Sequence, residues 1–334
     1  MRILISTGVY PPAHGGPSYY AKSLKDEFER LGHEVVVKTY TIEHVLPIGI
    51  RHLFYFFKTL PAYIRADWTL VLDTFSVGFP VACMKRLCGG KTILRTGGDF
   101  LWEHYVERTK EKILLSKFYD EPRQFTFKER LILRLTRFTL RMMSCVVFST
   151  RYQREIWMKP YELDVDRVRI VENRYGAATE KGTGSDVKHF VYCASRNLFW
   201  KNTDVVREAF VRAQQSVPGI TLDFLHDLPR EDAIEKIKKA YACILVSLGD
   251  ISPNYVLRAL SYGKPVILTS ENGLTDRIGD TVMYVDPLDV DVIAHAIVEM
   301  CNEKTHALYQ DRAVAFSFTH SYATIAQEFL KLAA

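Results

Sequence analysis

The sequence lacks the cysteine patterns of a structural metal site. Its six cysteines include no CxxC pair, and three of them lie in apolar, strand-like runs; the six are Cys83, Cys88, Cys145, Cys193, Cys243 and Cys301. We expect reduced core cysteines in a cytoplasmic protein. The first residues, MRILISTGVY, enter a short apolar strand and lack the longer apolar core and cleavage site of a signal peptide.

The sequence also lacks an uninterrupted hydrophobic run long enough to cross a membrane. The most apolar stretch, VLPIGIRHLFYFFKTLPAYI (45–64), contains Arg51, His52, Lys58 and Pro61. It is too charged for a spanning helix. Two interpretations remain: a helix packed on a sheet with its basic side chains at the surface, or a segment that dips aromatic and basic groups into a bilayer interface.

Strong charge of one sign is absent as well. The net charge is +5, and 25% of the 334 residues are charged while 48% are hydrophobic. Such a composition predicts a folded protein with two ordinary domains. The mild basic excess permits anionic partners, such as phosphates or lipid headgroups, without establishing any.

Strand and helix patterns alternate along the chain. The first half predicts strands at 3–7, 34–40, 68–73, 92–96, 145–150 and 167–171, with helices between them such as 17–32. After a polar, glycine-rich stretch at 176–188, the pattern restarts with strands at 189–195, 220–226, 243–248, 265–269 and 282–286 and helices at 202–215, 230–240, 253–262 and 291–301. Continuous apolar strands alternating with helices favour α/β domains with parallel sheets covered on both faces.

We therefore predict two Rossmann-like, doubly wound domains. The boundaries are 1–178 for the first domain, 179–187 for a linker, 188–315 for the second domain, and 316–334 for a last segment that contains the helix 321–333. Ligands of such sheets bind at the carboxyl ends of the strands, near helix N-termini. Four strand-exit loops are therefore the places to look for function.

The first loop, TGVYPPAHGGPSYY (7–20), places Gly15 and Gly16 directly before a helix that starts at Pro17. Glycines let backbone amides approach a ligand, and a helix N-terminus favours negative charge. A tight connection without a ligand explains the same residues equally well. The spacing is not G-x-G-x-x-G, which disfavours a dinucleotide-binding dehydrogenase.

The second loop, CASRNLFWKNTD (193–204), places Arg196 and Lys201 before a helix capped by Asn202 or Thr203. Two cations at a helix N-terminus suit a diphosphate. The alternative is a pair of solvated surface cations.

The third loop, RTGGDFLWEHY (95–105), carries Asp99 after Gly97 and Gly98. A carboxylate here is able to orient or deprotonate an acceptor hydroxyl. Asp99 is equally suited to cap the helix that FLWEHY begins.

The fourth stretch, DISPNYVLRALSYGKPVI (250–267), runs from a strand end through a helix to the next strand. Asp250 follows the strand, Ser252 suits the helix N-cap and Pro253 the first turn, and Asn254 continues the helix. Arg258 stands inside the helix, where a surface position beside core-facing leucines is the simplest interpretation.

Together these loops resemble the retaining GT-B glycosyltransferases of family 4. The resemblance covers nearly the whole chain in order: TGVYPPAHGG with LGHEV, the S-R-x4-K loop, the segment ALSYGKPVI and the closing helix. It implies the GT-B fold, with two Rossmann-like domains facing a cleft and a C-terminal helix that crosses back to the first domain.

The resemblance also implies roles for individual residues. Gly15 and Gly16 would face the donor phosphates, and Arg196 and Lys201 would neutralise the leaving diphosphate without a metal. Asp99 falls near an acceptor-side polar position. Asp250 would contact the donor sugar together with Ser252, Pro253 and Asn254 at the helix start.

Two departures from the family pattern stand out. The family's E-x7-E pair is Asp250 and Arg258 here, so the residue that usually holds the ribose has the opposite charge. The further strand and helix that usually precede this pair, often with a G-D-G-P turn, are reduced to DFLHDLPREDA, which predicts a shortened wall around the base.

The resemblance implies a metal-independent, retaining transferase that uses a UDP- or GDP-sugar, no other cofactor and no nucleic acid. Its acceptor would be a glycan or lipid-linked hydroxyl, and the protein would be cytoplasmic, with the inner face of the membrane as an alternative. The helical run 127–143 adds Arg130, Arg134, Arg137 and Arg141, which a solvated helix face explains more simply. A sugar-nucleotide epimerase or hydrolase and an inactive partner subunit are the rival functions; Arg258 favours the inactive subunit.

Overall fold

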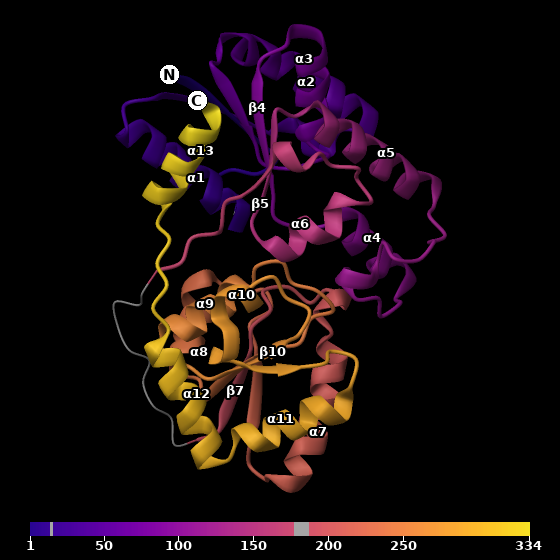
Figure 1. Cartoon of the computed structure of the whole chain (residues 1–334). Coiled ribbons are helices and arrows are strands. Elements are labelled where there is room, and N and C mark those ends of the chain that lie inside the picture. Colours follow the sequence, from indigo (N-terminus) through magenta and orange to yellow (C-terminus); the bar gives the residue numbers. More distant parts are fainter. Residues whose placement is uncertain (14–15, 177–186) are drawn as a thin grey trace. The chain divides into compact units, whose positions relative to one another are not determined.

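A computed structural model describes residues 1–13, 16–176 and 187–334, which form two compact units (Figure 1). The first unit contains residues 1–101, 123–174 and 320–334, and the second contains 102–122 and 175–319. Residues 102–122, which the sequence places inside the first domain, therefore pack with the second unit. Gly15 and nearly all of the predicted linker 179–187 lie outside the described residues.

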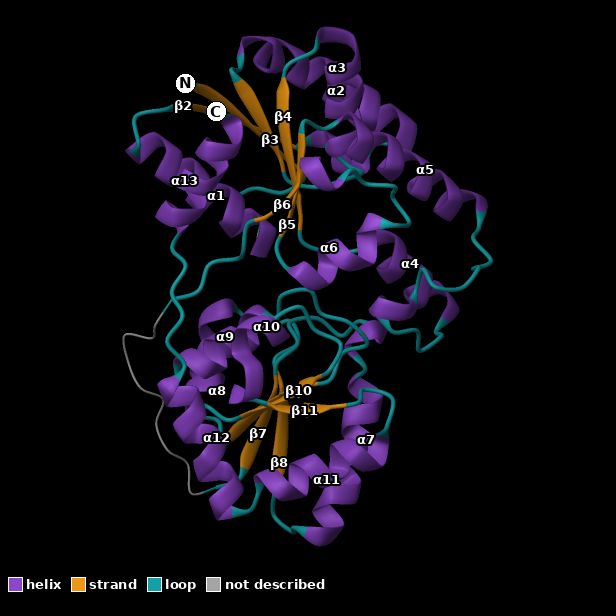
Figure 2. Cartoon of the chain, in the orientation of Figure 1, coloured by secondary structure: helices purple, strands orange, loops and turns teal. Residues whose placement is uncertain are grey.

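The first unit is a six-stranded parallel sheet in the order β2-β1-β3-β4-β5-β6. Its strands are β1 (Arg2–Thr7), β2 (Glu34–Thr39), β3 (Trp68–Val71), β4 (Lys91–Thr96), β5 (Cys145–Phe148) and β6 (Val168–Ile170). Its helices are α1 (Gly16–Arg30), α2 (Ile48–Arg65), α3 (Gly78–Cys88), α5 (Phe127–Met142), α6 (Arg151–Met158) and α13 (Tyr322–Ala333), with a 3-10 turn at Ile42–Val45. Helices α1 and α13 cover one face of the sheet, and α2, α3 and α5 cover the other (Figure 2). The predicted strands and parallel pairing are confirmed.

Local sequence accounts for the helix boundaries of the first unit. Thr126 and Glu129 form a reciprocal capping box at the start of α5. Thr150 caps α6 and Ser321 caps α13 through their side-chain oxygens. Helix α13 belongs to this unit because Ile325 and Phe329 are fully buried in the core that α1 and the sheet form.

The second unit is a five-stranded parallel sheet in the order β11-β10-β9-β7-β8. Its strands are β7 (His189–Tyr192), β8 (Thr221–Phe224), β9 (Ala242–Leu245), β10 (Val266–Thr269) and β11 (Met283–Val285). Its helices are α7 (Thr203–Ser216), α8 (Arg230–Lys239), α9 (Asn254–Ser261), α10 (Thr275–Ile278), α11 (Val290–Met300) and α12 (Glu303–Ala315), while α4 (Phe100–Thr109) leads into the segment that joins this unit. Strand β8 lies at the edge of the described sheet, in agreement with the shortened stretch DFLHDLPREDA.

In both sheets the order of the strands reverses beside the first strand of the unit. The chain adds β2 on one side of β1 and β3 on the other, and likewise β8 and β9 on the two sides of β7. The loops after the two flanking strands diverge at such a point and leave a crevice, which is where open α/β sheets bind ligands. The two switch points are therefore the exits of β1 and β3 and the exits of β7 and β9.

The cysteine prediction is partly wrong. Cys193, Cys243 and Cys301 are buried and free, but Cys88 is exposed because it ends α3 just before Gly89 and Gly90. Among the described residues, no helix is both long and apolar enough to cross a membrane.

The segment 45–64 is mainly helical, as in the first of its two interpretations, but Arg51, His52 and Lys58 do not lie on an open surface. Arg51 and Lys58 are half-buried. Arg51 donates to the carbonyl of Leu46, and Lys58 donates to the carbonyl of Thr39 and pairs with Glu43. The outer face of α2 is instead apolar.

Candidate functional site

The switch point of the second unit brings together two residues that the sequence selects. Lys201 comes from the loop after β7 and Asp250 from the loop after β9. The Lys201 ammonium lies 2.5 Å from an Asp250 carboxylate oxygen, and the two side chains are only 12% and 13% exposed. A pair this well shielded is held more firmly than a surface ion pair, because water screens it little.

Backbone bonds hold Asp250 in place at this edge. Its amide donates to the carbonyl of Glu271, and its own carbonyl accepts from the amide of Gly273. Asp250 therefore forms an isolated parallel bridge with Asn272, one loop beyond the end of β10. These backbone hydrogen bonds continue the parallel pairing beyond the ends of the strands. They fix the backbone of Asp250 and thereby the direction of its carboxylate.

The loop of Lys201 is fixed from both sides. The ammonium lies 4.1 Å from the ring centroid of Trp200, a cation–π contact. Asn202 follows in the left-handed region at φ 59°, and its side-chain amide donates to the carbonyl of Pro287 at 2.7 Å. Asn tolerates this conformation better than most residues, which explains its place directly before α7.

Helices α7 and α9 both start at this edge without a side-chain cap. The N-cap positions are Asn202 and Pro253, so the predicted capping by Ser252 is wrong by one residue, and Asn202 uses its amide on Pro287 instead. The hydroxyls of Thr203 and Ser252 are buried and have no hydrogen-bond partner within the described parts of the chain. Two uncapped helix N-termini and two unsatisfied hydroxyls suit an anionic or hydroxyl-rich ligand.

The two predicted arginines differ from Lys201. Arg196 is exposed, and Arg258 is half-buried in α9 beside the buried Leu257 and Ala259. Across residues 1–13, 16–176 and 187–334, neither guanidinium has a hydrogen bond or an ion pair. Since Asp250 already neutralises Lys201, Arg196 is the cation of the β7 loop whose charge is not compensated.

The segment Trp102–Pro122 also forms part of this edge, and the sequence did not indicate it. The Leu115 amide donates to the carbonyl of Leu248 at 3.0 Å, and the Ser116 hydroxyl donates to the Glu271 carboxylate at 3.0 Å. The Trp102 and Trp200 rings lie 5.5 Å apart. The nearest sequence signal is Gly249, where a Cβ would come within 2.4 Å of the Leu115 Cβ.

A small cavity lies at the start of α7. Its volume is about 40 Å³, and its lining consists of Lys112, Asn197, Leu198, Phe199, Asn202, Thr203 and Asp204. A water molecule occupies roughly 30 Å³ of liquid, whereas pockets for small molecules measure roughly 300–1,000 Å³. A cavity of this size has room for a water or a single anionic group but not for a whole nucleotide.

His226 is a further polar residue at this edge that sequence reasoning missed. It follows β8, and its Nε2 atom is buried without a hydrogen-bond partner among the residues that the structure covers. Burial lowers the pKa of the imidazole, which favours the neutral form. The HDLP turn that carries it was the available signal.

The first unit holds the other predicted residues. Gly16 begins α1 and is exposed. Asp99 follows β4, is 1% exposed, and accepts a 2.8 Å hydrogen bond from the Trp157 indole. An acceptor hydroxyl would reach this carboxylate only after a movement of Trp157 or of the turn at Gly97 and Gly98.

Asp73, at the exit of β3, is a first-unit residue that the sequence did not mark. One carboxylate oxygen accepts from the amides of Phe75 and Val77, at 2.9 and 3.1 Å. Burial raises the pKa of this carboxyl, while the amide bonds oppose the change. Within the described residues, no cluster of three or more His, Cys, Asp or Glu side chains could hold a metal ion.

Comparison with known proteins identifies the fold. Neither the known family models nor the curated proteins match the chain. Solved structures do: WaaG, a glycosyltransferase involved in lipopolysaccharide biosynthesis, has a TM-score of 0.72 at 12% identity over 100% of both chains. HepE from Anabaena in complex with UDP-glucose has 0.71 at 14% over 99% of both chains. Sucrose-phosphate synthase from Thermosynechococcus elongatus has 0.68 at 15%, over 99% of this chain and 98% of that one. The fold is GT-B, as predicted.

Proposed function

We propose that the protein is a metal-independent, retaining glycosyltransferase that moves a sugar from a nucleoside-diphosphate sugar to a hydroxyl of a glycan or lipid-linked acceptor. The observation that carries this proposal is the Lys201–Asp250 pair, which lies at a topological switch point. The loop of Lys201 also carries the uncompensated Arg196 and leads into the uncapped start of α7. Support also comes from solved structures of the same fold, because HepE was solved with UDP-glucose.

The proposed chemistry follows from the charges at this edge. A nucleoside diphosphate gains negative charge as it leaves the sugar, so fixed donors that meet it stabilise the transition state more than the ground state. Arg196 supplies the uncompensated positive charge, and the amides at the start of α7 add oriented dipoles. Lys201 joins them while Asp250, still bound to it, accepts hydroxyl hydrogen bonds from the sugar.

The remaining roles are also proposals. Gly15 and Gly16 close on the phosphates, Ser252, Pro253 and Asn254 present the start of α9 to the sugar, and Asp99 orients the acceptor. The donor is a UDP- or GDP-sugar with no further cofactor, and the work is done in the cytoplasm or at the inner face of the membrane. The His226 imidazole and the Arg258 guanidinium are the side chains available for the ribose and base.

The test is a product analysis with and without acceptor. The protein is incubated with labelled UDP- and GDP-sugars, first alone and then with short glycans and lipid-linked sugars. Transfer that requires the acceptor and keeps the anomeric configuration supports the proposal. A changed or released sugar without acceptor would instead identify an epimerase or hydrolase. Arg196→Ala should lose the activity, and Arg30→Ala, an exposed arginine of α1, should keep it.

Arg258 favours a second candidate, an inactive subunit that binds a partner glycosyltransferase. A guanidinium donates hydrogen bonds but cannot accept them, so it cannot replace a carboxylate on the ribose hydroxyls. Arg258→Glu separates the two candidates. If the position still serves the ribose, the variant binds nucleotide more tightly; if Arg258 has a new role in an active enzyme, the variant binds less tightly. Absence of nucleotide binding in both proteins would favour the inactive subunit.

A further inference from the structure

Helix α2 turns residues with polar groups toward the sheet and exposes apolar side chains, which is the opposite of an ordinary surface helix. Its buried residues are His52, Tyr55, Thr59 and Tyr63. Apart from Arg65 at its C-terminal end, its exposed large side chains are aliphatic or aromatic: Ile48, Ile50, Leu53, Phe54, Phe57 and Ile64, of which Leu53, Phe57 and Ile64 are 59%, 63% and 63% exposed. Helices on globular proteins normally bury their apolar face and expose the polar one.

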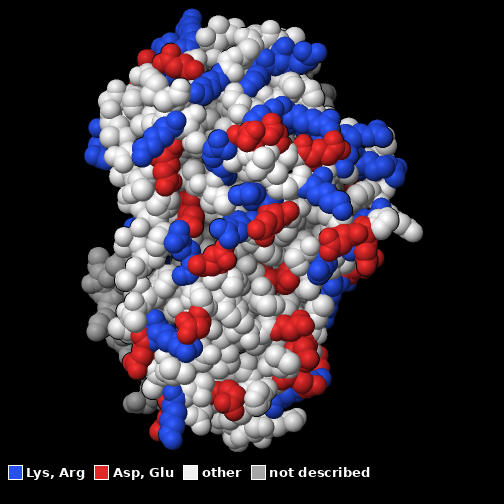
Figure 3. Space-filling view, in the orientation of Figure 1, with Lys and Arg blue, Asp and Glu red and all other residues white. Residues whose placement is uncertain are grey.

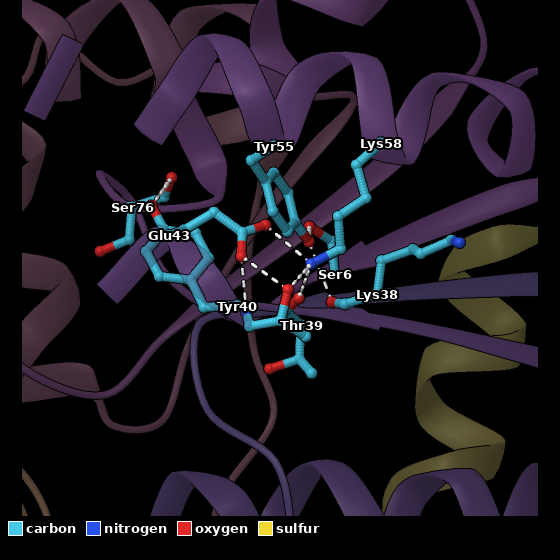
Figure 4. Close-up of polar contacts among 9 residues, drawn as sticks. Ser6, Lys38, Thr39, Tyr40, Glu43, Tyr55, Lys58 and Ser76 are labelled. Atoms are coloured by element: carbon cyan, nitrogen blue, oxygen red, sulfur yellow. Dashed lines mark hydrogen bonds and ion pairs between the residues drawn. The ribbon is translucent and has the colours of Figure 1, made fainter. Parts of the chain in front are cut away.

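Specific polar contacts account for this orientation. The Tyr55 hydroxyl lies 2.8 Å from the Ser6 hydroxyl and donates to the carbonyl of Lys38 (Figure 4). The Lys58 ammonium bonds the carboxylate of Glu43 and the carbonyl of Thr39, each at 2.7 Å. Rotating α2 to bury its apolar face would break these contacts and leave buried polar groups unsatisfied, so the outward apolar face is a stable feature of the fold.

The neighbouring helices add positive charge and more exposed apolar side chains. Helix α3 lies beside α2, and α5 beside α3, on one face of the sheet (Figure 2). Leu87 on α3 and Phe127 on α5 are 73% and 75% exposed. The exposed cations of the three helices are Arg65, Arg86, Lys128, Arg130, Arg134 and Arg141. We call the exposed residues of α2, α3 and α5 the α2–α3–α5 surface.

Acidic residues hardly contribute to this surface. The three helices and the turn before α2 contain two acids, Glu43 and Glu129, and both are fully buried. Glu43 is held by Lys58, and Glu129 completes the capping box of α5. Arg141 pairs with Glu162 from outside the helices. Figure 3 shows many Lys and Arg side chains over the part of the first unit that carries α3 and α5, with some Asp and Glu side chains among them.

We propose that the α2–α3–α5 surface docks the protein on a bilayer that contains anionic lipid. Protruding aliphatic and aromatic side chains on a helix that lies flat enter the boundary between headgroups and acyl chains. Flanking cations attract the negative headgroups and set the depth of insertion. The proposal rests on this surface alone and does not depend on the proposed sugar transfer.

The charges argue against a second copy of the chain as the occupant. A twofold contact through this surface would place its cations against the same cations of the other copy, with no exposed acid on the three helices to compensate them. The bilayer supplies both an apolar layer and an excess of negative charge, which is the combination that the surface complements.

The experiment is flotation of the full chain with vesicles. One set contains phosphatidylcholine alone, and the other contains equal parts of phosphatidylcholine and phosphatidylglycerol. We expect binding to the mixed vesicles that weakens as salt is raised, because salt screens the headgroup charge. Leu53→Ser with Phe57→Ser should lower the partition coefficient about tenfold or more. Lys128→Glu with Arg134→Glu should lower it by a similar factor.

Matched controls use exposed residues of the second unit. Val211→Ser with Leu308→Ser removes apolar side chains that are 59% and 48% exposed, and Lys239→Glu with Lys304→Glu makes the same change of net charge. Both controls should bind vesicles like the wild type. The proposal would be overturned if the controls and the surface variants lost vesicle binding equally. It would also be overturned if the wild type did not bind the mixed vesicles.

A second measurement locates the contact directly. Phe57→Trp keeps an aromatic side chain at the surface, and its fluorescence should be quenched by lipids brominated near the headgroup. Val211→Trp should gain no quenching over the wild-type tryptophans. If wild type fails to bind vesicles but self-associates, and Leu53→Ser with Phe57→Ser abolishes that association, the surface belongs to a second copy and the proposal is wrong.

Discussion

At both switch points an aspartate follows the strand at which the sheet order reverses, but the two aspartates make different contacts. Asp73 follows β3, and Asp250 follows β9, so each comes from the strand that reverses the order of its sheet. Asp73 bonds the amides of its own loop, whereas Asp250 bonds Lys201 from the opposite loop. The first carboxylate shapes its loop, and the second joins the two loops that frame a crevice.

The contrast extends to the residues that face the two aspartates. Gly8, opposite Asp73, would bring a Cβ within 3.2 Å of its second carboxylate oxygen. Lys201, opposite Asp250, lies in the loop that carries Arg196 and leads into α7. The switch point of the second unit therefore offers charged side chains, while the first unit offers backbone and burial at the corresponding position.

Breaking the Lys201–Asp250 pair should have the largest effect. Removing one partner leaves the other charge poorly solvated, which we expect to lower the free energy of unfolding of the second unit by about 2–4 kcal/mol. Lys201→Ala and Asp250→Ala are compared with the double variant by urea unfolding. The double variant should cost clearly less than the sum of the two; additive costs would show that the pair does not interact.

Lowering the pH should weaken the first unit through His52. Burial lowers the pKa of its imidazole from 6.5 to about 4, so the unfolded chain takes up a proton between these values and the folded one does not. Stability is thus fully present above pH 6.5 and falls as the pH drops toward 4, by about 2–3 kcal/mol. His52→Gln should flatten this slope in urea unfolding curves; an unchanged slope would assign it to other groups.

Gly249→Ala should loosen the contact of the segment 102–122 with the carboxyl ends of the strands in the second unit. The new Cβ would collide with the Leu115 Cβ, at a cost of about 1–3 kcal/mol. Limited proteolysis around 110–122 reports the loosening. Leu115→Ala combined with Gly249→Ala should not restore the contact, because the clash is with the Cβ itself, whereas Leu115→Gly should. Gly8→Ala, with more room, is the milder control.

Asp73→Asn should have the smallest effect. Burial raises the pKa of Asp73, so the stability that the protonated carboxyl contributes is fully present at low pH and is lost as the pH rises through the folded pKa. Asparagine keeps an acceptor for the amides, and stability at pH 7 should change by less than about 1 kcal/mol. Asp250→Asn should cost more under the same conditions. Equal costs would remove the contrast between the two aspartates.

Periodicity and strand ends were enough to predict most of the fold. The strands of both sheets, their parallel pairing and the loops that carry Lys201 and Asp250 follow from apolar runs that stop at polar residues. Capping was harder to predict: Ser252 and Asn202 have the right side chains, but Asn202 bonds Pro287, which lies far along the chain. The contacts of a side chain with distant residues leave no local pattern.

Two other features were beyond the sequence for the same reason. The docking of 102–122 on the second unit depends on pairs such as Ser116 with Glu271, which are far apart in sequence. The inversion of α2 depends on Ser6 and Lys38, which offer polar partners to its inner face. An amphipathic pattern indicates two faces but does not say which one the sheet will bind.

The central claim is that the switch point of the second unit binds a diphosphate through Arg196. Calorimetric titration of the full chain with UDP, UMP, GDP and GMP measures it directly, since each diphosphate differs from its monophosphate by one phosphate group. We predict that the matching diphosphate binds at least about tenfold more tightly than its monophosphate, because two cations and a helix N-terminus meet the second phosphate. This preference should collapse in Arg196→Ala and persist in Arg30→Ala. Equal affinities for diphosphate and monophosphate in the wild type, or an unchanged preference in Arg196→Ala, would contradict the account.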